Sequence, residues 1–277
     1  MSAIISYRNL ADDATLSGST SIAYPLANLQ SRQLAKVWRS NGLIAPSITA
    51  DLGHAQPVSL VALLNINSVV RGAGDCAIEY SSDAITWTSA SFALPADAGA
   101  LDLPHALFAR ILTSVLSKIT AARYIRLTPA WVRIGAANFY EAGRLWIGDT
   151  IDIPGGCDAG WALGGQDFGS LDRSAGLQFY PDRLPRGRIL RMPCTGIDTT
   201  IAYGFADNAV SALNVPSFDD LMNYAGSTGE VVAAHRVESA LWVRRTAIYG
   251  HLSPDSLLLP HQAGPKYAWN GTIIEER

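Results

Sequence analysis

The feature that most constrains the fold is the recurrence of short strand-like runs between turn-forming residues. The runs are rich in Val, Ile, Thr, Tyr and Trp, and clusters of Gly, Pro, Asn, Asp and Ser separate them, which is typical of antiparallel strands. In the segment 123–131, Ile125 and Leu127 share one face. Tyr124 and Arg126 share the other. A strand with one face in a core has this alternation, so we predict a mainly β protein.

The predicted strands cover much of the chain and leave few helical segments. In chain order the strands are 47–53, 57–67, 76–82, 86–92, 123–131, 142–148, 177–181, 188–194, 199–205, 229–235 and 240–252. Helices are predicted at 28–38, 103–119 and 217–226, and in the last of these Ser217 suits the N-cap. Turn residues cluster at 148–156. This cluster sets the predicted boundary between two domains, residues 1–149 and 150–277.

The charge of the chain argues against nucleic-acid binding. Lys and Arg number 21, Asp and Glu number 24, and the formal net charge is −3. Binding to phosphates needs a basic surface, and the one Arg-rich stretch, 183–191, is interpreted as a solvated or partner-facing strand. Charged residues make up only 16% of the chain, below the usual value of about a quarter, which suggests surface covered by partners. No apolar run approaches the length of a membrane span, so membrane insertion is not expected.

The three cysteines, Cys76, Cys157 and Cys194, are far apart in the sequence and have no CxxC spacing. Their odd number and spacing match neither a disulfide framework nor a zinc site. The first residues lack the basic and apolar regions of a signal peptide. These features predict assembly in a reducing cytoplasm, without a metal or other cofactor.

No motif in the sequence indicates an enzyme. The five histidines are scattered without metal-ligand spacing, and the sequence contains no nucleophile-elbow, P-loop or dinucleotide-binding motif. Asp149 and Asp152 are two carboxylates close in sequence that could act as acid and base, as in glycosidases. The alternative is that both belong to a turn at the domain boundary. We therefore predict no catalytic residues.

An ordered set of short motifs in the first half gives a more specific prediction. The set is Tyr-Pro at 24–25, Trp-Arg-Ser at 38–40, Asp-Leu-Gly at 51–53, IEYSSDAITWT at 78–88, ARYIRLT at 122–128 and GRLWIG at 143–148. Over about residues 20–148 this order resembles the galactose-binding-like β-sandwich of discoidin and coagulation-factor type C domains. The resemblance implies an N-terminal jelly-roll sandwich.

In this interpretation Trp38 closes one end of the sandwich as a large apolar plug. Trp87 is expected to pack inward after a turn, while Arg126 points outward. Members of the family that bind calcium have acidic residues before the helical turn. Here Arg32 and Lys36 occupy this region, so no calcium site is expected.

The resemblance also implies contacts with carbohydrate at the surface. Candidate glycan contacts are Trp38, Asn41, Arg71 and Trp131, because lectin sites place aromatic rings and planar polar groups on loops. The alternative is that both tryptophans anchor the core or a domain interface.

The second half resembles, in its architecture rather than in a motif, the β-rich domain of bacteriophage tail-tip proteins. Distal tail and related minor tail proteins combine such a ring-forming domain with a galactose-binding-like domain. The resemblance implies a β barrel or sandwich with a short helix. It also implies a structural virion protein at the tail tip, or baseplate, that contacts copies of itself, tail-tube proteins and hub proteins.

Two alternative functions remain open at this point. One is a carbohydrate-binding adhesin that contacts host surface glycans. The other is a glycan hydrolase with an accessory sandwich.

Overall fold

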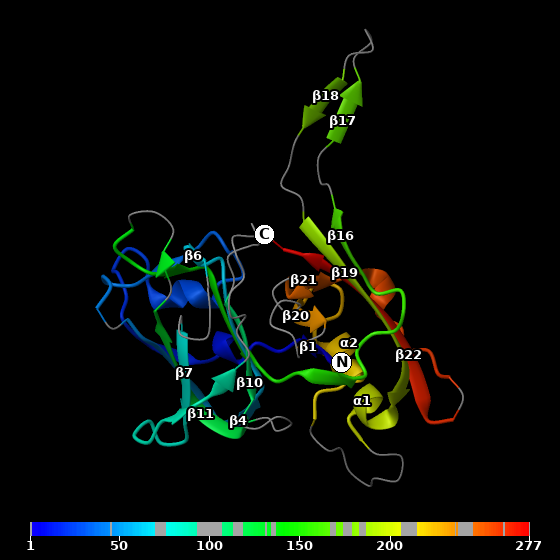
Figure 1. Ribbon diagram of the computed structural model, residues 1–277, viewed down its shortest axis with the longest axis horizontal. Coiled ribbons are helices and arrows are strands. Elements are labelled where there is room, and N and C mark those ends of the chain that lie inside the picture. The colour runs from blue at the N-terminus through cyan, green and yellow to red at the C-terminus, as the bar shows by residue number, and fades with distance from the viewer. Residues whose placement is uncertain are drawn as a thin grey trace. The chain divides into compact units, whose positions relative to one another are not determined.

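In the computed structural model the chain folds into two compact units (Figure 1). The structure describes residues 2–44, 46–69, 76–92, 107–112, 119–130, 132–133, 137–166, 170–173, 179–182, 187–205, 215–235, 237, 246–262 and 264–276. We name the units the sheet unit (Met1–Tyr7, Ile151–His235 and Thr246–Arg277) and the sandwich unit (Arg8–Thr150 and Arg236–Arg245). The chain passes from the sandwich unit to the sheet unit at Thr150, beside the predicted boundary. Residues 1–7, however, belong with the second half.

Two antiparallel sheets form the sandwich unit. The five-stranded sheet has the order β2 (Thr15–Gly18), β4 (Ile48–Val58), β11 (Ile119–Pro129), β7 (Cys76–Ser81) and β8 (Thr88–Ser89). The four-stranded sheet has the order β14 (Arg144–Gly148), β5 (Leu60–Leu64), β10 (Leu107–Leu112) and β9 (Ser91–Phe92). Short ladders join β12 (Val132–Arg133) to β6 (Ser68–Val69) and β13 (Glu141–Ala142) to β3 (Trp38–Arg39). Two 3-10 helices, η1 (Leu10–Asp12) and η2 (Leu26–Gln30), lie before and after β2 in the chain.

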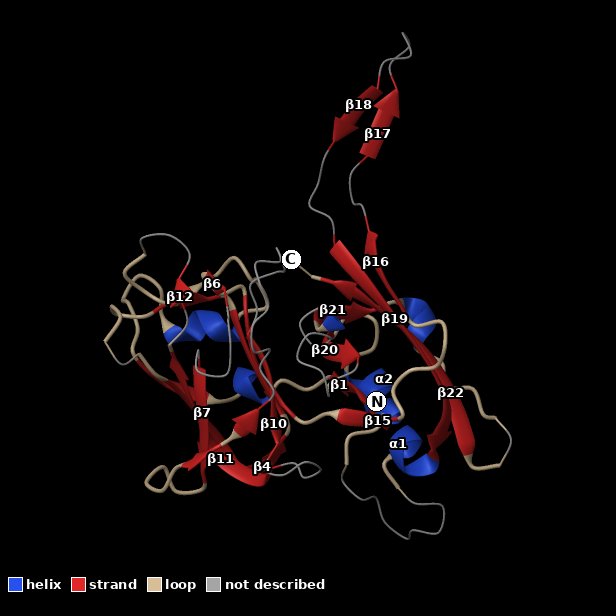
Figure 2. Cartoon of the chain, in the orientation of Figure 1, coloured by secondary structure: helices blue, strands red, loops and turns tan. Residues whose placement is uncertain are grey.

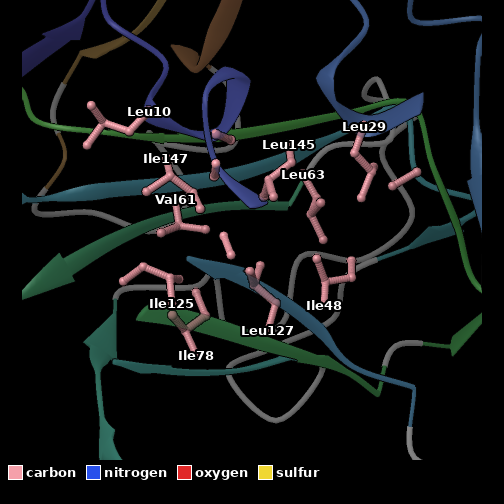
Figure 3. Close-up of a cluster of buried hydrophobic side chains, with 14 of the residues drawn as sticks. Leu10, Leu29, Ile48, Val61, Leu63, Ile78, Ile125, Leu127, Leu145 and Ile147 are labelled. Atoms are coloured by element: carbon pink, nitrogen blue, oxygen red, sulfur yellow. The ribbon is translucent and has the colours of Figure 1, made fainter. Parts of the chain in front are cut away.

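The core of the sandwich unit lies between these two sheets (Figure 3). The five-stranded sheet contributes Ile48, Ile78, Ile125 and Leu127, and the four-stranded sheet contributes Val61, Leu63, Leu145 and Ile147. All eight of these side chains are buried. Each stabilises the fold by about 1.5–3 kcal/mol relative to an exposed position. The alternation in the sequence therefore determines which face of each strand turns inward.

A buried arginine ties the start of the sandwich unit to β14. Arg144 is 0% exposed, and its two terminal nitrogens donate to the carboxylate of Asp12 at 2.6 and 2.9 Å. The Asn9 side chain donates to Asp12 Oδ1 at 2.8 Å and to the Leu145 carbonyl at 2.9 Å. Its Oδ1 accepts from the Ile147 N–H at 3.0 Å. Asn9 thus bonds to the backbone of β14 as a neighbouring strand would, and η1 is held against the sheet.

Replacing Asp12 with Ala is expected to lower the free energy of unfolding by about 3 kcal/mol. The change leaves the buried Arg144 guanidinium without its carboxylate partner. The expected loss of stability is at the lower end of the values for broken buried ion pairs, because the Asp12 side chain is one-third exposed. Urea titration of both proteins measures the difference. In the matched control Asp13→Ala, which changes the neighbouring exposed carboxylate, we expect a change within about 0.5 kcal/mol. Equal losses of stability in the two variants would contradict a stabilising role of the Asp12–Arg144 ion pair.

One seven-stranded antiparallel sheet forms the sheet unit. Its order is β15 (Ile151–Pro154), β1 (Ser2–Ser6), β20 (Glu230–His235), β21 (Ile248–Leu252), β22 (Lys266–Glu275), β19 (Gly187–Asp198) and β16 (Ala162–Gln166). The unit also contains the helices α1 (Thr199–Tyr203) and α2 (Phe218–Tyr224) and the 3-10 helix η4 (Pro254–Ser256). The N-terminal strand β1 pairs with both β15 and β20. This pairing explains why the first residues do not belong to the sandwich unit.

An indole anchors the core of the sheet unit. Trp269 is fully buried, its Nε1 donates to the Ser256 carbonyl at 2.8 Å, and its ring lies 4.8 Å from that of Phe218 on α2. The indole also lies against Gly271, where an added Cβ would come within 1.8 Å of the ring. Only glycine fits at that position, because any side chain would displace the indole.

Two nested antiparallel strand pairs, which we call the hairpin, are formed by β16 with β19 and by β17 (Ser170–Arg173) with β18 (Phe179–Asp182). β16 pairs with β19 from Ala162 opposite Arg191 to Gln166 opposite Gly187. Both ladders are visible in Figure 1. In the sheet order β16 has one neighbour and is therefore an edge strand.

The predicted fold class is confirmed, since both units are β-rich and strands predominate among the described residues (Figure 2). The helix at 217–226 is confirmed as α2, and Ser217 caps it by accepting from the Asp220 N–H at 3.1 Å. Other element predictions are wrong. Within the predicted helix 103–119, residues 107–112 are β10, because pairing with β5 and β9 overrides a helical apolar pattern.

Two further segments also differ from the prediction. The predicted strand 199–205 contains α1, which ends at Tyr203 and is followed by Gly204 as the C-cap, in a left-handed conformation with φ of 73°. The predicted helix 28–38 forms only the end of η2, and it then leads into the short strand β3.

Candidate functional site

The sequence candidates for glycan contact occupy different environments. Trp38 on β3 is 0% exposed, and its Nε1 donates to the Ser19 carbonyl at 2.9 Å, which is the position that a core anchor takes. Asn41 is exposed, and its backbone N–H donates to Ser19 Oγ at 3.2 Å. Arg71 and Trp131 lie outside the described residues. Of the two described candidates, Asn41 is at the surface.

Close to Asn41 in the chain, an arginine packs against two aromatic rings. The guanidinium carbon of Arg39 lies 3.8 Å from the ring centre of Tyr24 and 4.5 Å from that of Phe139. Its Nε donates to Glu141 at 2.6 Å. In these contacts the Arg39 guanidinium occupies a face of the Tyr24 ring and a face of the Phe139 ring. The cluster therefore holds the segment with Tyr24 and the segment with Phe139 together.

The outer side of the five-stranded sheet brings polar and aromatic side chains together from several strands. We call this surface the polar face and define it by Thr49, Asp51, Glu79, Trp87, Arg123, Tyr124 and Arg126. The cross-strand register aligns them, because Arg126 lies opposite both Thr49 and Glu79, and Tyr124 lies opposite Asp51. Ile125 and Leu127 on the same strand are fully buried on the inner side. The expectation that Arg126 points outward is confirmed.

The first group on the polar face is centred on Asp51. Arg123 donates to its carboxylate through Nε at 2.9 Å and through a terminal nitrogen at 3.1 Å. The Arg123 guanidinium also lies 4.9 Å from the ring centre of Tyr124. Hydrogen bonds from Arg123 and from the Gly53 N–H hold the pKa of Asp51 below its usual value. The carboxylate is therefore ionised at neutral pH and remains partly exposed, with 29% of the side chain accessible.

An irregularity in β4 lets Arg123 and Tyr124 both reach this surface. Along β11, Ala122 lies opposite Gln56, but Tyr124 lies opposite Asp51, so β4 has extra residues between these pairs. Gly53 stands in this bulge with φ of 78°, a backbone conformation that favours glycine. Bulges of this kind re-aim side chains at functional surfaces. Here two consecutive residues, Arg123 and Tyr124, are half-buried, and both contact Asp51.

The second group on the polar face consists of Glu79, Trp87 and Arg126. Arg126 Nε donates to Glu79 at 2.8 Å, and its guanidinium carbon lies 4.0 Å from the ring centre of Trp87. The expectation that Trp87 packs inward is wrong. The outward arginine gives the indole a partner on the outer side of the sheet, where a cation over the ring face is attracted by the quadrupole. Trp87 is half-buried.

A carboxylate fixes the turn that carries Trp87 from β7 to β8. Asp83 Oδ1 accepts from the N–H groups of Thr86 at 2.8 Å and Ile85 at 2.9 Å, and from Ser81 Oγ at 2.9 Å. These bonds lower the pKa of Asp83 from 3.8 to about 2, with Thr86 the largest cause. The Trp87 Nε1 donates to the Ala84 carbonyl at 3.2 Å within the same turn. The turn thereby holds the indole in position.

The Asp83→Asn variant is expected to unfold with a weaker pH dependence between pH 4 and pH 2. The pKa of Asp83 is depressed in the folded state, so its contribution to stability is complete above the unfolded value of 3.8. That contribution is lost as pH falls through about 2. Asparagine keeps an oxygen acceptor but does not titrate. Urea titrations at intervals of half a pH unit give the two slopes, and identical slopes would show that the carboxylate is not coupled to folding.

Among the described residues, no cluster of three His, Cys, Asp or Glu side chains is suited to hold a metal ion. Asp149 Oδ1 accepts from Ser59 Oγ and from the Thr150 N–H, both at 2.8 Å, as the turn interpretation of this carboxylate predicts. Asp152 lies on β15 of the sheet unit. In the part of the chain that the structure describes, no helix has the length and apolarity needed to cross a membrane.

No family model matches the chain, and no curated protein matches it. Similar solved structures include CpGH89CBM32-6 from Clostridium perfringens, with 19% identity over 50% of this chain and 98% of that chain and a TM-score of 0.37. CpGH89CBM32-4 from the same organism, in complex with GlcNAc-α-1,4-galactose, has 17% identity over 51% of this chain and 93% of that chain, with a TM-score of 0.38. Chitosan-binding module 1 of a chitosanase/glucanase from Paenibacillus sp. IK-5 has 20% identity over 51% of this chain and 98% of that chain, with a TM-score of 0.34.

These values do not assign the chain to a family. The similar structures give no support to the resemblance with phage tail-tip proteins.

Sequence reasoning missed most of the polar face, although part of its signal was visible. The alternation in β11 pointed Tyr124 and Arg126 outward, but nothing in one strand shows which acid lies opposite. Glu79 and Asp51 become partners only through the order β4, β11, β7 of the sheet. In the sequence, Gly53 is the one residue that points to the bulge that exposes Arg123.

Proposed function

We propose that the sandwich unit binds carbohydrate through the polar face. The observation that supports this most directly is the presence, on one accessible sheet surface, of two arginine–carboxylate pairs and two aromatic rings. A site for a neutral sugar needs planar polar groups that bond its hydroxyls and apolar rings that cover its C–H surface. The proposal corresponds to the adhesin alternative, in which the protein binds a glycan without transforming it.

The charged pairs suit hydroxyl groups because they offer donors and acceptors side by side. A sugar hydroxyl donates one hydrogen bond and accepts others. A guanidinium presents only N–H donors and a carboxylate only acceptors. Both Arg123 and Arg126 pair with an acid on the adjacent strand, and between 24% and 41% of each of these four side chains remains accessible. A hydroxyl at either pair would therefore meet both kinds of group at once.

The aromatic rings supply the apolar part of the proposed surface. Tyr124 and Trp87 flank the two arginines and are half-buried, so each has a supported ring with an accessible portion. Ion pairs and stacking hold the side chains before binding, which reduces the conformational entropy lost when a ligand is bound.

Replacing Trp87 with Ala is expected to weaken glycan binding by about tenfold or more, equivalent to about 1.4 kcal/mol. The change removes a ring surface and frees Arg126 from its stacking partner. A glycan array that includes galactose- and glucosamine-containing oligosaccharides identifies the ligand for the wild-type protein. Calorimetry with that ligand then compares the variants, whose folding is checked by circular dichroism.

The matched control is Asn41→Ala, which changes the exposed sequence candidate and leaves the polar face intact. We expect it to bind like the wild type. Loss of binding in Asn41→Ala with normal binding in Trp87→Ala would move the site to the loops. A wild-type protein that binds no glycan on the array would contradict the proposal as a whole.

We propose, as a second candidate function, a structural role in an assembly such as a phage tail tip. One observation favours it: the edge strand β16 has no charge or proline to block pairing, and Ala162 to Gly165 are exposed. The opposite edge, β15, has Asp152 and Pro154, which are typical protective residues. An unprotected edge accepts another strand. If that strand comes from a different surface of the next copy, the contact is head-to-tail, and its repetition generates a ring when it closes.

Leu163→Lys is expected to abolish self-association of the wild-type protein, because a charge on the edge strand opposes strand addition. Sedimentation velocity over a hundredfold range of concentration measures the association. Leu258→Lys is the control, since Leu258 is 69% exposed in the same unit but lies outside β16. A wild-type protein that stays monomeric throughout the range would argue against this second function.

A further inference from the structure

Two cysteines that are distant in sequence meet in the sheet unit. The Sγ atoms of Cys157 and Cys194 lie 3.7 Å apart, although the residues are 37 positions apart in the chain. Cys194 on β19 is 1% exposed, and Cys157, which follows β15, is half-buried. Both are thiols in this structure. The sequence spacing alone gave no sign of this pair.

The pair stands at the base of the hairpin, beside the β16–β19 ladder. At this end the β16–β19 ladder begins with Ala162 opposite Arg191. Cys157 lies a few residues before Ala162 in the chain, and Cys194 lies a few residues after Arg191. The backbones are already joined at this point, because the Asp158 N–H donates to the Pro193 carbonyl at 2.7 Å. The two thiols are therefore held close together by the fold.

We propose that Cys157 and Cys194 are an oxidation site, at which a disulfide forms and clasps the base of the hairpin. The oxidant would be a low-molecular-weight disulfide such as oxidised glutathione. The Cys157 thiolate, after losing its proton to solvent, attacks the oxidant and releases one thiolate, which takes up a proton. The Cys194 sulfur then loses its proton and attacks the mixed disulfide at Cys157. The second thiol leaves, so two protein thiols and one small disulfide become one protein disulfide and two small thiols.

The exposure of the two groups sets the order of attack. Cys157 is the more accessible thiol and meets the oxidant first. The hydrogen bond with Cys157 and burial raise the pKa of Cys194 well above its usual value. Cys194 therefore remains protonated and shielded until the mixed disulfide lies beside it. Cys76, the third cysteine, is buried in the sandwich unit and has no place in this reaction.

The test is oxidation of the full-length protein with excess oxidised glutathione, followed by mass spectrometry of the intact chain and of its unreduced peptides. We expect a loss of two hydrogens, one remaining thiol at Cys76, and a cross-linked peptide that joins Cys157 to Cys194. Three remaining thiols would overturn the proposal. So would a bond to Cys76 or a bond between two chains.

A second measurement compares thermal unfolding before and after oxidation. A disulfide between Cys157 and Cys194, which are 37 positions apart, is expected to raise the midpoint temperature of unfolding by about 10 °C. Dithiothreitol should reverse the shift. Cys157→Ser and Cys194→Ser should lose the shift, while Cys76→Ser should keep it. An unchanged midpoint in the oxidised wild-type protein would contradict a clasp. Because wild-type peptide mapping is independent of the variants, a variant that fails to fold leaves the proposal testable.

Discussion

The architecture depends on the position of one short strand, β1, inside a sheet built otherwise from the second half of the chain. Its residues pair on one side with β15 and on the other with β20, so the sheet is complete only when the two ends of the chain have met. Ile5 lies opposite Ile151. The two ends of Arg8–Thr150, the larger segment of the sandwich unit, are therefore held on adjacent strands. This segment is an insertion between two neighbours of one sheet, and such insertions are tolerated because their ends lie close together.

Within that insertion, the proposed binding surface is a consequence of how the sandwich packs. Ile125 and Leu127 must face the core, so Tyr124 and Arg126 must face outward from the same strand. The neighbouring strands then place Glu79 opposite Arg126 and Asp51 opposite Tyr124, and the β4 bulge brings Arg123 to Asp51. The interactions that order the surface are therefore set by the same register that buries the apolar side chains. A shift of one residue in β11 would disrupt both.

Local patterns in the sequence were enough to predict the sandwich strands β4, β5, β7, β11 and β14 and the capped helix at 217–226. They were not enough where pairing with distant strands decides the conformation. Leu107–Leu112 has an apolar pattern compatible with a helix, yet it lies between β5 and β9 as a strand. Membership of β1 in the C-terminal sheet depends on contacts across most of the chain. Trp38 and Asn41 were site candidates because of a resemblance to a family. The Asp51–Arg123 and Glu79–Arg126 pairs of the polar face could be predicted only from the order of strands in the sheet, which no single segment of the sequence contains.

The pairing of charges on the sandwich surface has one more consequence. Each exposed arginine there is neutralised by a carboxylate within hydrogen-bonding distance, so the surface as a whole projects little electrostatic potential into solution. A partner would approach by unguided diffusion, and long-range attraction would not enrich polyanions near it. Association with an uncharged polymer should then vary little with ionic strength, unlike recognition that depends on a basic patch.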